Sequence, residues 1–200
     1  YGSGVAKSME VLAHPQQPEA GAEVRVGPEL AGLVLEGGVW LGKPLPGRLG
    51  AAALDGAIAR SARTGAPLGV LFLDLDGFKA VNDTYGHQTG DDVLCEVARR
   101  LDEEARAGDF CARLGGDEFV IIAENVAGVE GASALARRVT QRIAEPFAVG
   151  PAGLTRTHLG VSIGIAMRRE ANDTPLSVLA RADEAAYRAK RAGSGVELAH

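Results

Sequence analysis

Two short acidic segments carry the side chains best suited to metal-dependent chemistry. Asp74 and Asp76 follow an apolar run at residues 68–73, and Asp117 and Glu118 follow two glycines between two further apolar runs. Carboxylates at the end of a buried strand are where α/β proteins place metal and ligand groups. Either pair could also be solvated charge at a strand end or a turn. If the strands are neighbours, however, three or four carboxylates meet and repel one another unless a divalent cation is present. Oxygen ligands of this kind suit Mg²⁺ or Mn²⁺.

The residues between the two acidic segments suggest a nucleotide as the substrate. An Asn amide and an Asp carboxylate, such as those of Asn82 and Asp91, can complement the edge of a guanine, and Lys79 could meet a phosphate. Asp91 could equally be the N-cap of a helix at residues 92–106. Gly115 and Gly116 leave room for a phosphate to approach the backbone. The expected chemistry is phosphoryl transfer.

The elements that must position these residues alternate between helix and strand. The apolar spacing predicts helices at residues 49–63, 92–106, 131–144 and 176–191 and strands at 68–73, 110–113, 119–123, 159–167 and 196–199. Residues 74–90 are expected to be a polar loop. The two glycines between the strands at 110–113 and 119–123 predict a tight hairpin. This hairpin implies an α/β fold with a mixed sheet, since a purely parallel sheet has no such turn.

Residues 1–47 differ from the regular pattern that begins at residue 48. They are interrupted by several prolines and are interpreted as a linker or the tail of an upstream module, with one possible strand at residues 30–35. Residues 37–44 imitate a phosphate-binding loop, but Pro44 stands where a Ser or Thr hydroxyl is needed. We therefore interpret this segment as a glycine-rich connector. Residues 48–200 are predicted to form one domain.

The composition limits the partners and the location. The formal net charge of −5, from 21 basic and 26 acidic side chains, argues against nucleic-acid binding, which needs a basic face. No apolar run is long enough to cross a membrane, so no membrane contact is expected from this part of the protein. Cys95 and Cys111 lie in apolar patterns and are expected to be small buried thiols. A cytoplasmic location is expected, although the parent protein could be attached to a membrane.

Five blocks of this sequence resemble the GGDEF domain of diguanylate cyclases. The blocks are residues 74–83, 86–91, 113–119, 162–166 and 182–190, and the likeness runs from about residue 45 to residue 198 in the order of the family. The resemblance implies a nucleotide-cyclase-like fold with a ferredoxin-like core. Such a fold has a mixed, mainly antiparallel sheet flanked by helices and carries the GGDEF motif on a β-hairpin.

The resemblance also implies an activity and its residues. The enzyme would join two GTP molecules into cyclic di-GMP and release two pyrophosphates, with two copies of the domain meeting face to face. Asp74, Asp117, Glu118 and the carbonyl of Leu75 would hold Mg²⁺ or Mn²⁺, and Asp117 or Glu118 would assist deprotonation of the attacking 3′-hydroxyl. The residues implied in substrate binding are Phe78, Lys79, Asn82, His87, Asp91, Gly115, Gly116 and Lys190.

An Arg-x-x-Asp sequence precedes the two glycines by five residues, where the family places a product-inhibition site. Arg106 would grip guanine and phosphate of cyclic di-GMP, and Asp109 would read guanine. On residue types alone this is a surface pair at a helix end. Arg137 or Arg138 could supply a secondary contact, although simple solvation explains either one alone.

Two departures from the family pattern leave a second hypothesis open. Ser194 stands where the family commonly has a phosphate-binding arginine, and Trp40 stands where the entry motif of the family has an aspartate. The first hypothesis is an active diguanylate cyclase, supported by the full acidic set. The second is a catalytically weak module that senses GTP or cyclic di-GMP and regulates an attached domain.

Overall fold

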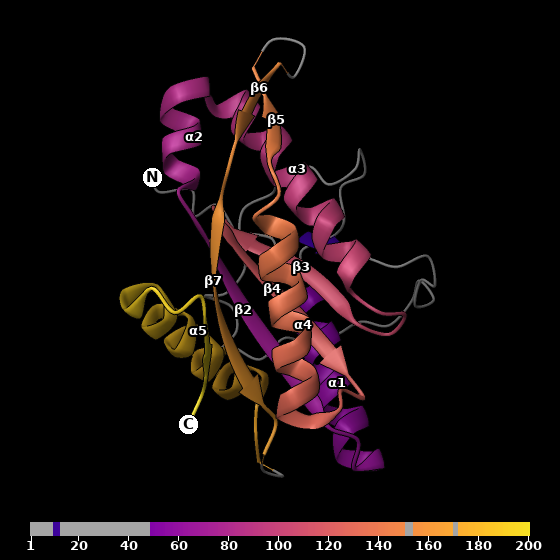
Figure 1. The fold of residues 1–200 in the computed structure, drawn as a ribbon. Helices are drawn as coiled ribbons and strands as arrows, with labels where there is room; N and C mark the ends of the chain where they lie inside the picture. The colour runs from indigo at the N-terminus through magenta and orange to yellow at the C-terminus, as the bar shows by residue number, and fades with distance from the viewer. Residues whose placement is uncertain (1–9, 13–48, 151–153, 170–171) are drawn as a thin grey trace, which may run out of the picture.

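A computed structural model describes residues 10–12, 49–150, 154–169 and 172–200 of the chain. Its helices are α1 (Leu49–Thr64), α2 (Phe78–Tyr85), α3 (His87–Glu104), α4 (Gly128–Ile143) and α5 (Pro175–Ala192). Its strands are β1 (Glu10–Leu12), β2 (Leu68–Asp76), β3 (Phe110–Gly115), β4 (Glu118–Glu124), β5 (Phe147–Val149), β6 (Thr155–Thr157), β7 (Gly160–Met167) and β8 (Val196–Leu198). Figure 1 shows the helices arranged around one central sheet and the β5–β6 hairpin at the top of the view.

The central sheet has the order β1-β3-β4-β2-β7-β8, with β2 in its middle. All neighbouring strands are antiparallel except β7 and β8, which are parallel. The predicted fold class, a mixed and mainly antiparallel sheet flanked by helices with the glycine pair on a hairpin, is therefore confirmed. β1 lies within the segment interpreted as a linker, whereas the possible strand at residues 30–35 and the connector at 37–44 fall outside the described residues.

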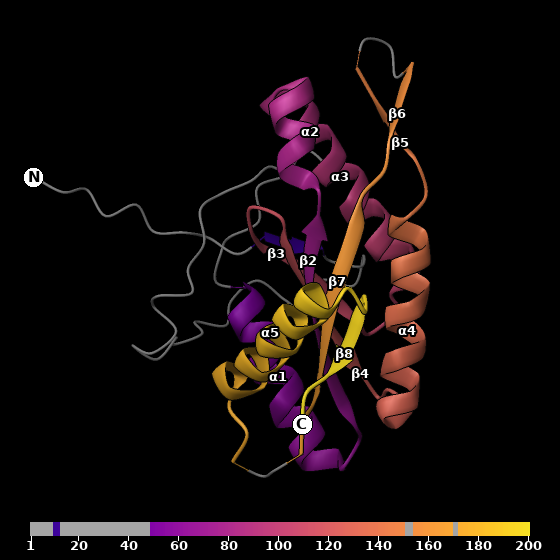
Figure 2. The same cartoon turned by 60° about the vertical axis from the view of Figure 1, so that its left-hand side comes forward.

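Each face of the sheet buries its own core. The side chains of Leu71, Leu73 and Leu75 pack into the core beneath α3 and α4, while Val70 and Phe72 pack into the core beneath α1 and α5. Figure 2 shows α1 and α5 on one side of the strands and α4 on the other. Because side chains alternate along a strand, the carboxylates that follow at positions 74 and 76 continue the row that faces α5. This alternation sets the place of the acidic side chains.

Helix α5 lies directly against β7, and one glycine permits the contact. A Cβ atom on Gly164 would lie 1.9 Å from the carbonyl oxygen of Ala182 and 2.2 Å from the backbone nitrogen of Ala186. The helix presents a buried stripe of alanines to this surface. Thr174 begins the helix, because its side chain accepts a hydrogen bond from the Ser177 N–H and Ser177 returns one to the Thr174 N–H. Gly164 therefore allows the close approach of α5 to the sheet, and the Thr174–Ser177 pair fixes where the helix begins.

The expected polar loop at residues 74–90 is wrong. Strand β2 continues through Asp76, and α2 starts after Gly77, whose φ of 86° allows the chain to turn at once into a helix. Helix α3 starts at His87 rather than at residue 92, so Asp91 lies inside the helix and is not its N-cap. Helix α4 likewise starts at Gly128, three residues earlier than expected, and the short β5–β6 hairpin was not foreseen. Cys111 is buried as expected, whereas Cys95 is only partly buried.

A buried arginine ties α3 to the end of α4. The Arg100 guanidinium donates to the carbonyl oxygens of Arg142 at 3.0 Å, Glu145 at 2.7 Å and Pro146 at 2.9 Å. The Arg142 carbonyl belongs to the last turn of α4, where carbonyl oxygens have no N–H partner within the helix. Glu96 accepts from the Arg100 Nε at 2.8 Å and so neutralises the buried cation. Arg100 thus acts as a cap supplied by the neighbouring helix.

This arrangement makes the stability of the domain depend on pH below 4.5. Hydrogen bonds from Arg99 and Arg100 lower the pKa of Glu96 from 4.5 to about 2. A carboxyl whose pKa is depressed on folding contributes stability above its unfolded pKa and loses it as the pH falls through the folded pKa. We expect Glu96→Gln to lower the free energy of unfolding by about 1 kcal/mol at pH 7, because charged hydrogen bonds are lost at a partly exposed site. Urea unfolding at pH 7 and pH 3 should show a smaller difference for the variant than for the parent. Equal pH dependence of the two proteins would contradict this.

Candidate active site

The acidic end of β2 lies beside the turn of the β3–β4 hairpin. Asp74 is directly opposite Glu118 in the antiparallel pairing, and the Leu75 N–H donates to the Asp117 carbonyl oxygen at 3.1 Å. The two acidic segments are 43 positions apart at Asp74 and Asp117, and they meet at one end of the central strands, as the sequence predicts. This end, with Asp74, Asp76, Asp117 and Glu118, is called the acidic edge below. The side chains of Asp74, Asp117 and Glu118 are all partly exposed there.

The hairpin turn is shaped by glycine and closed by an arginine. Gly116 has a φ of 54°, a left-handed conformation that favours glycine. The Arg113 guanidinium crosses the turn and donates to the Gly116 carbonyl oxygen from Nε at 3.0 Å and from Nη2 at 2.9 Å. These two bonds hold the backbone of the turn directly before Asp117. No role was expected for Arg113, whose sequence signal is its place at the start of the block at residues 113–119.

Lys190, in the last turn of α5, brings a positive charge to the acidic edge. Its Nζ lies 2.7 Å from an Asp74 carboxylate oxygen and 3.8 Å from an Asp76 oxygen. The hydrogen bond to Asp74 raises the pKa of the lysine, with smaller contributions from the charges of Asp76 and Asp117. The ammonium therefore sits where a bound cation would compensate the same carboxylates.

Asp76 is held by a residue that sequence reasoning missed. The buried Ser162 hydroxyl on β7 donates to both Asp76 oxygens, at 3.0 and 3.3 Å. Ser162 pairs with Asp74 in the sheet register, so the bond to Asp76 runs diagonally across the two strands. The sequence signals were a serine in an apolar strand and its place at the start of the block at residues 162–166, for which no role was expected.

Helices α2 and α3 bring the expected guanine-reading residues close together. Asn82 on α2 packs over Gly90 on α3, where an added Cβ would lie 1.9 Å from the Asn82 Oδ1. Asp91 follows Gly90 directly and is exposed. Phe78 is buried, whereas Lys79 and His87 are exposed at the starts of the two helices. The absence of a side chain at Gly90 therefore leaves the space that the Asn82 side chain occupies.

The Arg-x-x-Asp segment forms a tight turn at the other end of β3. The Asp109 N–H donates to the Arg106 carbonyl oxygen at 2.9 Å, and the Asp109 carboxylate accepts from the Arg106 N–H at 2.9 Å. Burial raises the pKa of Asp109 above its ordinary value. The turn is separated from Gly115 by the length of β3, about 20 Å for six residues. On the neighbouring helix α4, Arg138 is bound to Glu104 at 3.0 Å, whereas Arg137 is exposed.

The acidic edge suits a cation that is bound partly by the phosphate oxygens of a ligand. It suits a cation enclosed by protein side chains alone less well. Within the described residues, no three His, Cys, Asp or Glu side chains form a group that could hold a metal ion. The two acidic segments lie side by side here, but their side chains do not converge as one group of three. The reason is geometric: Asp76 is drawn to Ser162, and the Lys190 ammonium lies against Asp74. Mg²⁺ is commonly bound by one or two carboxylates together with substrate phosphates, which this donor set can supply.

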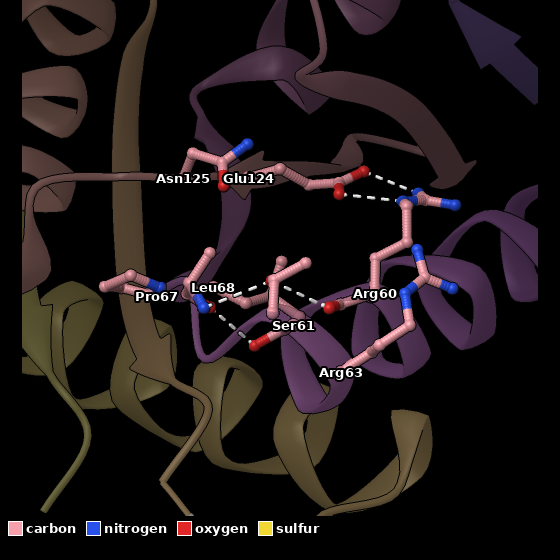
Figure 3. Close-up of a pocket in the computed structure, with 9 residues that line it drawn as sticks. Arg60, Ser61, Arg63, Pro67, Leu68, Glu124 and Asn125 are labelled. Atoms are coloured by element: carbon pink, nitrogen blue, oxygen red, sulfur yellow. Dashed lines mark hydrogen bonds and ion pairs between the residues drawn. The ribbon is translucent and has the colours of Figure 1, made fainter.

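A small cavity, drawn in Figure 3, lies beside Leu68 and Glu124, at the opposite end of the β2–β4 pair from Asp74 and Glu118. It measures about 100 Å³ and is lined by Arg60, Ser61, Arg63, Thr64, Ala66, Pro67, Leu68, Glu124 and Asn125. Arg60 forms an ion pair with Glu124 across its mouth. A pocket for a nucleotide-sized molecule usually measures several hundred Å³, about 300 or more. This cavity is therefore too small to be the substrate site.

The comparison with known proteins identifies the family. Residues 48–195 match the diguanylate cyclase GGDEF domain, and the chain belongs to this family. It is 40% identical over 141 residues to the response regulator PleD of Caulobacter vibrioides, covering 70% of this chain and 31% of PleD. It is 42% identical over 140 residues to the bifunctional diguanylate cyclase/cyclic di-GMP phosphodiesterase MucR of Pseudomonas aeruginosa, covering 70% of this chain and 20% of MucR. The chain thus spans about a third or less of these relatives.

Solved structures show the same fold. The GGDEF domain of YfiN from Pseudomonas aeruginosa is 35% identical with a TM-score of 0.71, covering 76% of this chain and 94% of that one. The active GGEEF domain of a diguanylate cyclase from Vibrio cholerae is 33% identical with a TM-score of 0.68, covering 76% and 96%. The GGDEF domain of DgcB from Caulobacter crescentus, solved with cyclic di-GMP, is 34% identical with a TM-score of 0.67, covering 74% and 86%. Among the residues that the structure describes, no helix is long and apolar enough to cross a membrane.

Proposed function

We propose that residues 48–200 form a diguanylate cyclase that condenses two GTP molecules into cyclic di-GMP and two pyrophosphates. One observation carries the proposal: Asp74 lies opposite Glu118 of the hairpin at the acidic edge, and Lys190 contacts Asp74 there. Membership of the GGDEF family supports the reaction type. Residues 1–47 remain interpreted as a linker or upstream tail.

In this proposal the acidic edge holds the metal and removes the proton. The carboxylates of Asp74, Asp117 and Glu118 and the carbonyl of Leu75 would hold Mg²⁺ or Mn²⁺. The ion supplies positive charge against the phosphate oxygens as the bonds rearrange. Asp117 or Glu118 accepts the proton of the ribose 3′-hydroxyl, whose oxygen then bonds to the α-phosphorus of the other GTP. The bond from that phosphorus to the bridging oxygen breaks, and pyrophosphate leaves.

The remaining residues bind and orient the nucleotide. Asn82 and Asp91 read the guanine, and His87 contacts the substrate at the start of α3. Lys79, the backbone at Phe78 and the Gly115–Gly116 backbone surround the phosphates near the start of α2, where exposed N–H groups favour anions. Lys190 reaches the outer phosphates. Each domain binds one GTP, so turnover requires a second copy of the domain, and positioning supplies much of the rate enhancement.

The first experiment incubates the chain at high concentration with GTP and Mg²⁺ and separates the products by chromatography. We expect cyclic di-GMP from the parent chain and from Glu130→Gln, which removes an exposed acid at the far end of the sheet. We expect at least about 100-fold less product from Asp117→Ala, because a metal and proton-accepting carboxylate is lost. Equal product from the parent and Asp117→Ala would refute the assignment of the site.

A sensor of GTP or cyclic di-GMP is the second candidate, and Ser194 favours it. The Ser194 hydroxyl donates to Glu197 at 3.0 Å and carries no charge for a phosphate. Loss of a charge-assisted contact costs about 1.5–3 kcal/mol of binding free energy. Substrate binding is then weaker, while the carboxylates of the acidic edge stay in place. Tight binding of either nucleotide by a chain that makes no cyclic di-GMP would establish this reading.

Product inhibition is proposed to act at the Arg106–Asp109 turn, with exposed Arg137 as the secondary contact because Arg138 is bound to Glu104. We expect Arg106→Ala to raise the inhibitory concentration of cyclic di-GMP by about tenfold or more, since a charged hydrogen bond to the ligand is lost. Arg138→Ala is the matched control on the neighbouring helix and should change inhibition less than Arg137→Ala. Unchanged inhibition in Arg106→Ala would exclude this turn.

A further inference from the structure

Asp76 is the one carboxylate of the acidic segment at the end of β2 to which the proposed mechanism gives no task. It follows Asp74 on the same side of β2, and its side chain is 39% exposed. Ser162, only 3% exposed, donates its hydroxyl hydrogen bond to this carboxylate. Hydrogen bonds to a charged acceptor are stronger than neutral ones, and a buried donor has no competing water. The carboxylate is therefore anchored from the sheet.

The strand opposite Asp76 limits where the carboxylate can go. Gly160 is its partner in the β2–β7 register. A Cβ on Gly160 would lie 3.2 Å from the Asp76 Cβ and 3.3 Å from Oδ2, so the carboxylate occupies the space above this glycine. The bond from Ser162 and the space above Gly160 together fix Asp76 near Lys190.

Lys190 has two carboxylate neighbours and prefers one of them. Its ammonium lies 2.7 Å from Asp74 and 3.8 Å from Asp76. In the proposed reaction, a carboxylate oxygen of Asp74 would bind a divalent cation. A cation there repels the ammonium and weakens the attraction between Lys190 and Asp74. Asp76 is then the anchored acceptor that is closest to the displaced ammonium.

We propose that Asp76, anchored by Ser162, is a positioning residue that retains Lys190 at the acidic edge when a divalent cation occupies Asp74. The retained ammonium is then available for the outer phosphates of the nucleotide. Asp76 acts through Lys190 and is not itself a metal ligand or a proton acceptor. The inference rests on the proposed function, because it needs a nucleotide that binds with a cation at Asp74.

A double-mutant cycle on Asp76 and Lys190 tests the inference, because residues that act through one another give non-additive effects. The ligand is 3′-deoxy-GTP with Mg²⁺, which lacks the attacking hydroxyl and so reports binding without turnover. Isothermal titration calorimetry should give about tenfold weaker affinity for Asp76→Asn and for Lys190→Met, equivalent to about 1.4 kcal/mol each. The double variant should bind no more than about twofold more weakly than Lys190→Met alone. Additive losses, about 100-fold in the double variant, would overturn the inference.

Ser162→Ala tests the anchor without changing any charge. We expect Ser162→Ala to bind 3′-deoxy-GTP about threefold more weakly. Adding it to Asp76→Asn should cause no further loss of affinity, because the charged acceptor of the Ser162 hydrogen bond is already absent. Parent-like affinity of Asp76→Asn would also overturn the inference. Urea unfolding of each variant excludes a folding defect, and Glu130→Gln controls for the loss of one negative charge.

Binding and turnover measured on the parent chain distinguish a failure of this inference from a failure of the proposed function. If the parent chain binds 3′-deoxy-GTP but makes no cyclic di-GMP from GTP, the cyclase proposal fails while the cycle still decides the role of Asp76. If the parent chain makes cyclic di-GMP, Asp76→Asn should raise KM for GTP more than it lowers kcat. A metal ligand would instead lower kcat strongly, and that result would contradict a positioning role. Absence of nucleotide binding by the parent would refute both.

Discussion

Gly164→Ala is expected to cost about 3 kcal/mol of folding free energy, the upper part of the usual range for overpacking. The added methyl group would lie 1.9 Å from the Ala182 carbonyl oxygen and 2.2 Å from the Ala186 nitrogen. Both are backbone atoms in the middle of α5, so no side chain can rotate away. The helix must move off β7 or the strand must bend. Urea unfolding should show a lower midpoint with an unchanged slope.

Gly69→Ala is the matched control for this prediction. Gly69 also lies in a central strand, on β2, but its added Cβ would meet Met167 at 3.4 Å, Val126 at 3.5 Å and Ala132 at 3.6 Å. These are ordinary packing distances, so the cost should stay below about 1 kcal/mol. Equal destabilisation by the two substitutions would show that the α5 backbone contact is not what makes Gly164 necessary.

The folded fraction of Gly164→Ala should also bind GTP more weakly. Lys190 reaches Asp74 because its helix lies directly on β7. A helix that moves outward carries the ammonium away from the acidic edge. We expect at least about tenfold weaker binding of 3′-deoxy-GTP, comparable with the loss of the lysine contact itself.

Gly90→Ala is expected to separate folding from substrate selection. An added Cβ would lie 1.9 Å from the Asn82 Oδ1 and 3.4 Å from the Phe78 ring. The Asn82 side chain is flexible and can turn away, which removes it from the position proposed for guanine reading. Because Gly90 lies within α3, alanine there also gains up to about 1 kcal/mol of helix propensity. The variant should therefore fold as stably as the parent.

The measurement is the preference for GTP over ATP in competition for the domain. We expect Gly90→Ala to reduce this preference by about 10- to 100-fold, the value of one or two specific hydrogen bonds. Asn82→Ala should reproduce the loss, and the two substitutions together should cost little more than either one. A stable Gly90→Ala variant with unchanged preference would exclude Asn82 from guanine recognition.

The elements with a strong apolar pattern were predictable from the sequence, and those with a weak one were not. Strand β7 and helix α5 match their expected ranges within one residue at each end, because long buried segments leave a clear pattern. Helix α2 was missed because only Phe78, Val81 and Tyr85 mark its inner face among polar neighbours. Their spacing of three and four residues is helical, but over eight residues it is a faint signal.

Two contacts that support the site, one at Asp76 and one at Gly164, could not be predicted from the sequence. Ser162 meets Asp76 across 86 residues of sequence, and the need for glycine at position 164 arises only when α5 lies on β7. The meeting of Asp74 with the hairpin was predictable, since it needed only two neighbouring strands. The contact of Lys190 with Asp74, 116 residues away in the chain, could not be foreseen in the same way.

The ion pair between Lys190 and Asp74 also bears on how the domain is made in the cell. Synthesis runs from the N-terminus, and the acidic end of β2 leaves the ribosome more than a hundred residues before Lys190 does. Until then, Asp74 and the hairpin carboxylates have no neutralising lysine, and β2 lacks β7 on one side. Contacts between residues so far apart in the chain form late because their closure costs the most entropy. The acidic edge is therefore completed only when α5, the C-terminal helix of this domain, has been synthesised. Before that point the nascent domain carries the carboxylates of Asp74 and the hairpin without Lys190, on a sheet that still lacks β7.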